Sequence, residues 1–365
     1  MSEKLLKFII WVSGFVCLYA FLGVRILPMF NQVLVENRLP EYFEFTKYGE
    51  QYYSGYIMHF REELPAPVDK YRLSDRNATL HNCDLIAFGD SFFDFSRQKT
   101  VAERLHDSLG IRVHSMVGFN VAKDWYPLIY LTEKAYQKSE RKFIVYQVVE
   151  RNIHNRFIEP HELQWKGLQT TTAGRLTPLV QAKDWIFNDK SEELYNLLLK
   201  GSYLTTGLYT LIATLKFDLF GYMASQTPVY SLDQFEVPML FWDVTVNDAT
   251  TSFYFEKSDE MIKTYCEHIL DLSEKLSEIY NLEMVFLPVP NKFTLYYKSI
   301  RPDDRYDNFL PRLYRAMDES GINYVNIYDE FVKQQELLYY GTDSHWNEKG
   351  VDITVRKLLE KLKPN

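Results

Sequence analysis

Basic residues are in the minority in this sequence, and repeats or low-complexity segments are missing. Lysine and arginine number 41 against 49 aspartate and glutamate residues, which gives a net charge of −8 at pH 7. Because the chain has no net positive charge to compensate the phosphates of a nucleic acid, this balance argues against a nucleic-acid partner. Hydrophobic residues make up 46% of the chain and charged residues 25%. These shares are ordinary for a folded globular protein, so we expect a substantial core.

Cysteine is scarce, and histidine forms no cluster. Of the three cysteines, Cys17 lies in an uncharged N-terminal run, which leaves Cys83 and Cys266 as the only possible disulfide pair. We expect both to be buried thiols. The eight histidines are scattered along the chain, which is a poor arrangement for a set of metal ligands. Neither a metal nor another cofactor is predicted.

The longest stretch without a charged residue covers residues 8–24. Its length is at the short end of what spans a bilayer, and Arg25 could extend its charged head to the surface. A cleaved signal peptide is the alternative, but no small-x-small cleavage site follows cleanly. Lys4 and Lys7 favour a cytoplasmic N-terminus. The sequence therefore predicts a single-pass anchor in the inner (cytoplasmic) membrane, with the remaining chain on the periplasmic or extracytoplasmic side.

The chain is predicted to have three parts. Residues 1–30 would form a cytoplasmic tip and the anchor, and residues 31–81, with several prolines and tyrosines, a stalk or N-terminal wrap. Residues 82–365 would form the main domain. Alternating strand and helix patterns are lost over residues 155–255, which we interpret as an insertion. A separate second domain is less favoured, because each flank of this segment carries an incomplete sheet.

Apolar runs and helical spacing alternate on both sides of the insertion. The first three predicted strands start about 30 residues apart, which is the size of a βαβ unit. Strands are predicted at residues 85–88, 112–117, 143–149, 284–287 and 324–327, and helices at residues 101–109, 122–137, 258–279 and 351–362. This order predicts an α/β fold, a three-layer sandwich around a mostly parallel sheet.

A serine follows the first predicted strand, in the segment Gly89-Asp90-Ser91-Phe92. The carboxyl edge of an open parallel sheet is where ligands bind, and the unpaired N–H groups of a helix that follows the serine can face an oxyanion. The segment is not the Gly-x-Ser-x-Gly elbow of α/β-hydrolases. Aspartate and serine also favour turns and caps for purely structural reasons, so this motif alone leaves both interpretations open.

A second polar segment, Gly341-Thr342-Asp343-Ser344-His345-Trp346, precedes the last predicted helix. A catalytic histidine needs a neighbour that fixes its tautomer and stabilises the imidazolium, and Asp343 can reach His345 from two positions earlier. The alternatives are that both residues cap the final helix, or that His345 belongs to a metal site.

Taken together, the two segments resemble the SGNH hydrolase superfamily, which has its serine after the first strand and Asp-x-His or Asp-x-x-His before the last helix. The resemblance implies a Ser91, His345 and Asp343 triad. Gly118 follows the second strand where the family has its oxyanion-hole glycine, and Asn152 follows the third strand where the family has its asparagine. Together with the Ser91 backbone N–H, these two residues are the implied oxyanion-hole donors.

Three segments are similar to the alginate O-acetyltransferase branch of that superfamily: Asp343-Ser344-His345-Trp346, Val148-Val149-Glu150-Arg151 and Pro288-Val289-Pro290-Asn291-Lys292. The resemblance covers roughly residues 82–155 and 258–362. It implies O-acetyl transfer to an exported or cell-surface polysaccharide. It also implies a membrane-bound O-acyltransferase partner that hands acetyl groups across the bilayer.

Three residues near these motifs are candidates for binding substrate: Arg151, Lys292 and Trp346. The alternative for Arg151 and Lys292 is that each is a surface or ion-paired cation. The alternative for Trp346 is core packing. A glycosidase pair of Glu150 and Asp343 is disfavoured, because it leaves the serine and the histidine without roles. Two other functions stay open: a carbohydrate esterase (deacetylase) that uses water as acceptor, and a non-catalytic envelope scaffold with the same fold.

Overall fold

The computed structural model divides the chain into two compact units, which are considered separately. It describes residues 7–8, 10–15, 49–51, 56–65, 78–93, 98–117, 126–138, 140, 142–159, 203–223, 229–230, 238–247 and 250–362. The larger unit comprises Gly49–Tyr52, Glu62–Thr172 and Ser225–Asn365, and the smaller unit Met1–Tyr48, Tyr53–Arg61 and Ala173–Ala224. Parts of the predicted stalk and of the predicted insertion therefore belong to the unit that contains the sheet.

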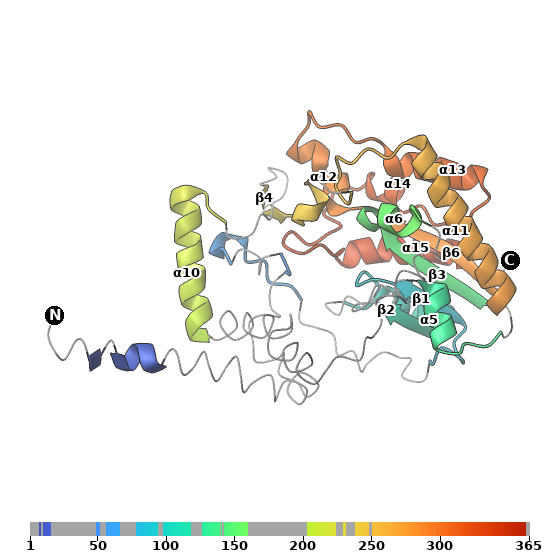
Figure 1. Ribbon diagram of the computed structural model, residues 1–365, viewed down its shortest axis with the longest axis horizontal. Coiled ribbons are helices and arrows are strands. Elements are labelled where there is room, and N and C mark those ends of the chain that lie inside the picture. Colours follow the sequence, from blue (N-terminus) through green and yellow to red (C-terminus); the bar gives the residue numbers. More distant parts are fainter. Residues whose placement is uncertain are drawn as a thin grey trace, which may run out of the picture. The chain divides into compact units, whose positions relative to one another are not determined.

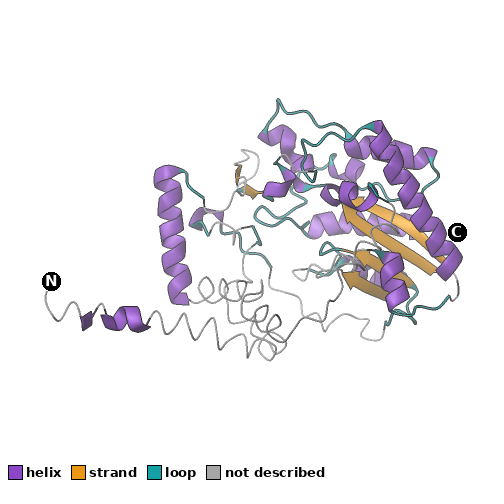
Figure 2. Ribbon diagram, viewed as in Figure 1, coloured by secondary structure: helices purple, strands orange, loops and turns teal. Residues whose placement is uncertain are grey.

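The larger unit is built on a four-stranded parallel sheet (Figure 1, Figure 2). The strand order is β2-β1-β3-β6, and the strands are β1 (Leu85–Gly89), β2 (Val113–Val117), β3 (Lys142–Val149) and β6 (Leu282–Val289). Every residue of β1 is buried, as expected for a strand that is covered on both faces. The predicted α/β class and the first four predicted strands are confirmed.

Helix α4 (Val101–Leu109) begins and ends where its sequence predicts. The Thr100 hydroxyl accepts a hydrogen bond from the Glu103 N–H, and the Glu103 carboxylate accepts one from the Thr100 N–H. This reciprocal cap satisfies two donors that the first turn would otherwise leave unpaired. The helix ends at Gly110, whose φ of 65° is left-handed and therefore suits glycine.

Helices cover both faces of the sheet. Helix α5 covers Pro127–Glu133. The connections β1–α4–β2 and β2–α5–β3 run in opposite directions across the sheet, so right-handed crossovers put their helices on opposite faces. Helix α4 packs against α15 (Glu348–Leu362). Helix α11 (Asp259–Tyr280) packs against α5 (Pro127–Glu133), α6 (Glu150–Phe157) and α13 (Phe309–Glu319). Figure 1 shows α11 running along the sheet.

Several predicted elements differ from the structure. The predicted fifth strand is reduced to one parallel bridge between Tyr324 and Phe286, because α14 (Tyr328–Phe331) begins soon afterwards. The predicted helix at residues 122–137 is described only as α5, since residues 118–125 lie outside the described residues. The other elements of this unit are α12 (Lys292–Ile300), the 3-10 helix η6 (Asp243–Thr245), and the antiparallel pair β4 (Val229–Tyr230) and β5 (Met239–Leu240).

In the smaller unit, helix α10 (Tyr203–Phe220) packs against the 3-10 helix η3 (Met58–Phe60). The rings of Phe60 and Phe217 meet edge to face, and the Met58 N–H donates to the Thr214 hydroxyl. Within the described part of the chain, no helix combines the length and the apolar character needed to cross a bilayer. The predicted transmembrane helix therefore has no support here. Of residues 8–24, only residues 8 and 10–15 are described, and they are helical.

The two cysteines outside the N-terminal run are free and buried, as expected from their sequence context. Burial raises the pKa of the Cys83 thiol, and it raises the pKa of Cys266 to about 12. Both side chains therefore behave as small apolar core residues at neutral pH.

Candidate active site

The turn after β1 positions Ser91 at the carboxyl edge of the sheet. The Asp90 N–H donates to the Gln147 side-chain oxygen on the neighbouring strand β3 at 2.9 Å. A side chain at Gly89 would meet that same oxygen at 2.4 Å, so the close approach requires glycine. The Asp90 carboxylate then accepts the Phe92 N–H at 3.1 Å, which closes the turn. Ser91 is left partly exposed at its tip.

The structure brings Ser91, His345 and Asp343 into one hydrogen-bonded chain. The His345 Nε2 atom lies 2.6 Å from the Ser91 hydroxyl, and its Nδ1 atom lies 2.5 Å from Asp343 Oδ1. The same aspartate oxygen accepts the His345 backbone N–H at 2.9 Å, which fixes the ring and the carboxylate relative to each other. Both residues are buried, whereas Ser91 is partly exposed. This is the geometry in which an imidazole removes a serine proton.

Charges around His345 favour its protonated form. Burial lowers the pKa of His345, but the carboxylates of Asp343, Glu50 and Asp90 outweigh burial, so the pKa is raised above its ordinary value. Burial raises the pKa of Asp343, but His345 and the backbone N–H groups outweigh burial, so that pKa is lowered. The site therefore stabilises an imidazolium beside a carboxylate, which is the charge state that forms when the serine proton is taken.

Two glutamates that the sequence placed in the stalk hold the loop that carries Asp343. The Glu50 backbone N–H donates to Asp343 Oδ2 at 2.9 Å. The Glu62 carboxylate accepts the Gly341 N–H at 3.1 Å, and the Thr342 N–H and hydroxyl at 2.6 and 2.9 Å. Sequence reasoning missed both residues, because neither lies in a local motif that points to the site.

Lys292 is a support of the same loop. Its ammonium donates to the backbone oxygens of Leu240 at 2.7 Å, Gly341 at 2.6 Å and Asp343 at 3.1 Å. The side chain is only 5% exposed, so the predicted contact with substrate is not what the structure shows. Burial lowers the pKa of Lys292 to about 7 against the opposing effect of nearby carboxylates. Three carbonyl acceptors match the three protons of the ammonium form.

Trp346 joins the two loops from inside the core. Its side chain is 0% exposed, and its indole N–H donates to the Phe92 backbone oxygen at 3.1 Å. The Phe92 ring in turn packs against both the Trp346 and the His345 rings. The interpretation of Trp346 as a sugar-binding residue therefore gives way to its alternative, core packing beside the triad.

The remaining predicted residues lie on the first turn of α6 or outside the described residues. Asn152 and Arg151 are half-buried there, directly after β3. Burial lowers the pKa of Arg151, while Asp90 and Glu50 oppose this shift, so the guanidinium lies among the charges around the triad. Neither side chain has a hydrogen-bond partner among the described residues. Gly118 lies outside the described residues.

Glu150 is a structural clamp. One of its oxygens accepts the Asn291 N–H and the other accepts the Tyr306 hydroxyl, both at 2.8 Å. These bonds tie the start of α6, directly after β3, to the residue before α12 and to the segment after α12. Burial raises the pKa of the carboxyl. A glycosidase pair with Asp343 finds no support, since both carboxylates are already occupied by structural or triad partners.

Glu50, Asp343 and His345 also offer ligand atoms within 4.8 Å of one another, which is the spacing of a metal site. A metal on His345 Nδ1 would leave Nε2 protonated, so the imidazole could not accept the Ser91 proton. The triad needs Nδ1 bound to Asp343 and Nε2 able to accept the Ser91 proton, so a metal on Nδ1 is incompatible with that role of His345.

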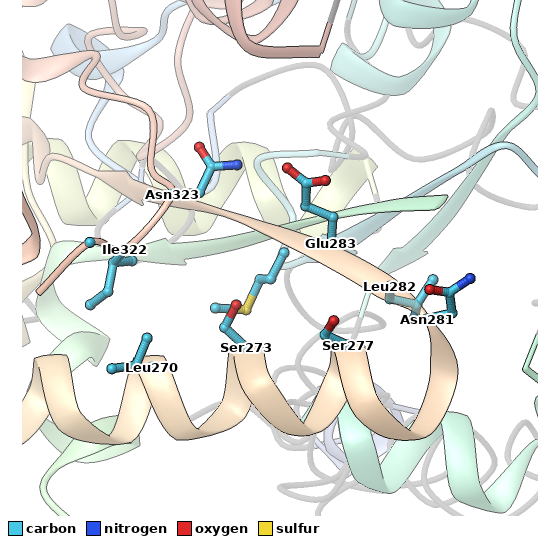
Figure 3. Close-up of a pocket in the computed structure, with 10 residues that line it drawn as sticks. Leu270, Ser273, Ser277, Asn281, Leu282, Glu283, Ile322 and Asn323 are labelled. Carbon is cyan, nitrogen blue, oxygen red and sulfur yellow. The ribbon is translucent and has the colours of Figure 1, made fainter. Parts of the chain in front are cut away.

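A small cavity of about 150 Å³ lies at the opposite end of β6 (Figure 3). It is lined by Ser273 and Ser277 of α11, by Glu283 at the start of β6, and by Asn323. Ligands of open parallel sheets bind at the carboxyl edge, whereas this cavity lies at the amino edge, where no triad residue is found. It is not the reaction site.

Comparison of the chain with protein-family models, with curated proteins and with solved structures found no match in any of the three.

Proposed function

We propose that this protein is a serine acyl-transfer enzyme, with Ser91 as nucleophile, His345 as general base and acid, and Asp343 as the residue that orients the imidazole. The observation that carries the proposal is the continuous hydrogen-bonded chain from Ser91 through His345 to Asp343 at the carboxyl edge of the sheet. Helix capping alone would require neither the contact between His345 and Ser91 nor the convergence of two loops 254 residues apart.

The steps follow from the positions of the atoms. His345 Nε2 takes the Ser91 proton while the serine oxygen bonds to the acyl carbon, whose carbonyl electrons move onto its oxygen. When the carbonyl re-forms, the leaving group departs with the proton from His345. An acceptor hydroxyl then gives its proton to His345 while its oxygen attacks the acyl carbon. When the carbonyl re-forms again, the bond to the Ser91 oxygen breaks, and His345 returns the proton to that oxygen. The Ser91 N–H, Gly118 and Asn152 are the proposed oxyanion donors.

The finer proposal is O-acetyl transfer to an exported or cell-surface polysaccharide by an SGNH-type three-layer domain. The segments at residues 148–151, 288–292 and 343–346 support it by their resemblance to the alginate O-acetyltransferase branch, and the segment at residues 89–92 by its resemblance to the SGNH superfamily. Acetyl groups would come from a membrane-bound O-acyltransferase partner. The uncharged run at residues 8–24 is the proposed anchor in the inner membrane, with the catalytic domain on the periplasmic or extracytoplasmic side.

A carbohydrate esterase is the second candidate, because the same triad with water as acceptor gives hydrolysis. The two functions are separated by giving the purified full chain an activated acetyl ester, with and without oligosaccharides. Acetylated oligosaccharide identifies a transferase, whereas acetate alone identifies an esterase. A non-catalytic scaffold would give neither product above the uncatalysed rate.

Replacing the nucleophile tests the proposal directly. Ser91→Ala should lower the rate of acyl transfer by roughly 10⁶-fold, because the acyl-enzyme can no longer form. The melting temperature should stay nearly unchanged, since Ser91 is partly exposed at the tip of a turn. Ser273→Ala, at the amino edge, is the matched control and should keep full activity. Full activity in Ser91→Ala would refute the assignment.

A further inference from the structure

Glu50 makes two separate kinds of contact with the residues of the triad. Its backbone N–H donates to Asp343 Oδ2, the oxygen that His345 does not use. Its side-chain oxygen Oε1 lies 4.0 Å from His345 Nδ1. The backbone contact fixes the aspartate whatever the side chain is. The carboxylate contact depends on glutamate.

Hydrogen bonds hold the Glu50 carboxylate in place. Oε1 accepts the backbone N–H of Ser344 and the indole N–H of Trp242, both at 3.2 Å, and also the Ser344 hydroxyl. The main chain on either side of Glu50 also lies close to the loop of Asp343. The Gln51 N–H donates to the Thr342 oxygen at 3.0 Å, and a side chain at Gly49 would lie 2.2 Å from that oxygen. The carboxylate is therefore positioned by three hydrogen bonds to one of its oxygens and by the close fit of the main chain.

We propose that Glu50 is a positioning residue of the catalytic centre, a second acid whose carboxylate stabilises the imidazolium of His345 as it forms. The inference rests on the proposed function. Before the reaction, the carboxylates of Glu50 and Asp343 face a neutral ring and repel each other. When His345 takes the serine proton, both carboxylates face a cation. The contribution of Glu50 thus appears mainly in the transition state, where it accelerates the reaction.

Other charges around the site set the size of this contribution. Asp90, on the turn after β1, adds to the negative charge that His345 faces, whereas Arg151 on α6 and Lys292 on α12 oppose it. The Glu50 side chain is 34% exposed, so solvent partly screens its charge. Loss of the charge alone should therefore lower kcat by roughly tenfold rather than by the full effect of losing a triad member.

The decisive variant is Glu50→Gln in the full chain, which keeps the shape of the side chain and removes its charge. Without that charge the imidazolium is less favoured, so the pKa of His345 falls. His345 acts as a base in its neutral form, so the acid limb of the pH–kcat profile should move to lower pH. KM for a small acetyl ester should be unchanged. Glu50→Asp, which keeps the charge, should restore part of the wild-type profile.

Glu256→Gln, which removes one charge from an exposed glutamate, is the control and should leave the profile unchanged. Titration of the His345 imidazole by NMR reports the same shift without any turnover. The inference is overturned if Glu50→Gln leaves both the titration and the acid limb in place, or if activity falls only in proportion to melting temperature. An inactive wild-type chain would refute the proposed function, while the NMR titration would still decide the role of Glu50.

Discussion

The two loops that meet at the candidate active site are held in different ways. The serine loop is fixed by its own turn, by the Gln147 side chain from the adjacent strand, and by the Trp346 indole N–H, which donates to the Phe92 oxygen. The loop of Asp343 and His345 depends on Glu50, Glu62 and Lys292, which come from distant parts of the chain. A reactive hydroxyl only has to be exposed at the end of a turn, whereas an imidazole and a carboxylate that pair with each other are buried. Because the buried backbone of their loop is irregular, its N–H and C=O groups need hydrogen-bond partners from elsewhere in the chain.

Removing the imidazole should have the largest effect. His345→Ala takes away both the base and the acid, so the rate should fall by roughly 10⁶-fold. Asp343→Asn should cost less, roughly 10⁴-fold, because the aspartate orients the ring but never handles the substrate proton. Rates with an activated acetyl ester at neutral pH measure both. If Asp343→Asn left the rate unchanged, Asp343 would be a residue that caps the last helix and not a member of the triad.

Removing a support of the loop that carries Asp343 and His345 should have the next largest effect. Lys292→Met removes the donor to three buried backbone oxygens, so the free energy of unfolding should fall by roughly 2–4 kcal/mol. Activity should fall with it, because the backbone of Asp343 loses one of its supports. Denaturant unfolding and ester turnover measure the two effects. Lys298→Met, on the same helix and exposed, is the matched control. If Lys292→Met kept wild-type stability, the loop of Asp343 and His345 would not depend on the hydrogen bonds from Lys292.

Loosening the serine loop should have the smallest effect. Gln147→Leu leaves the Asp90 N–H without its acceptor, but it also removes a buried amide nitrogen that has no partner among the described residues. The two changes oppose each other, so stability should fall by at most about 1 kcal/mol. Melting temperature and turnover should both stay near wild type. If Gln147→Leu lowered the free energy of unfolding as much as Lys292→Met does, the two loops would not differ in how strongly they depend on side chains outside the loop.

The same difference explains what the sequence could predict. Strands β1, β3 and β6 consist mostly of apolar residues, and Ser91 follows β1 after a single residue. A short stretch of sequence is therefore enough to predict both the strands and the candidate nucleophile. Asp343 and His345 lie two positions apart, which is also a local pattern. These features require no knowledge of distant contacts.

What the sequence could not predict depends on distant contacts. Glu50 and Glu62 look like ordinary charges of a polar segment, and only the fold brings them to residues more than 270 positions away. Lys292 and Trp346 were predicted near the site, but their side chains point into the protein, and side-chain direction depends on packing. The fifth strand failed because a short apolar run does not reveal where the next helix begins.

The contact between Glu50 and Asp343 also bears on how the protein is made. These residues are 293 positions apart, and Glu62 and Gly341 are 279 apart. On the ribosome, the segment with the two glutamates emerges long before its partner loop, so these hydrogen bonds form only after residues 341–345 have been synthesised. Under the proposed function, a nascent chain that lacks those residues carries Ser91 without the base that would activate it. Catalytic competence would then be acquired late, after the first strand and its serine have already been made.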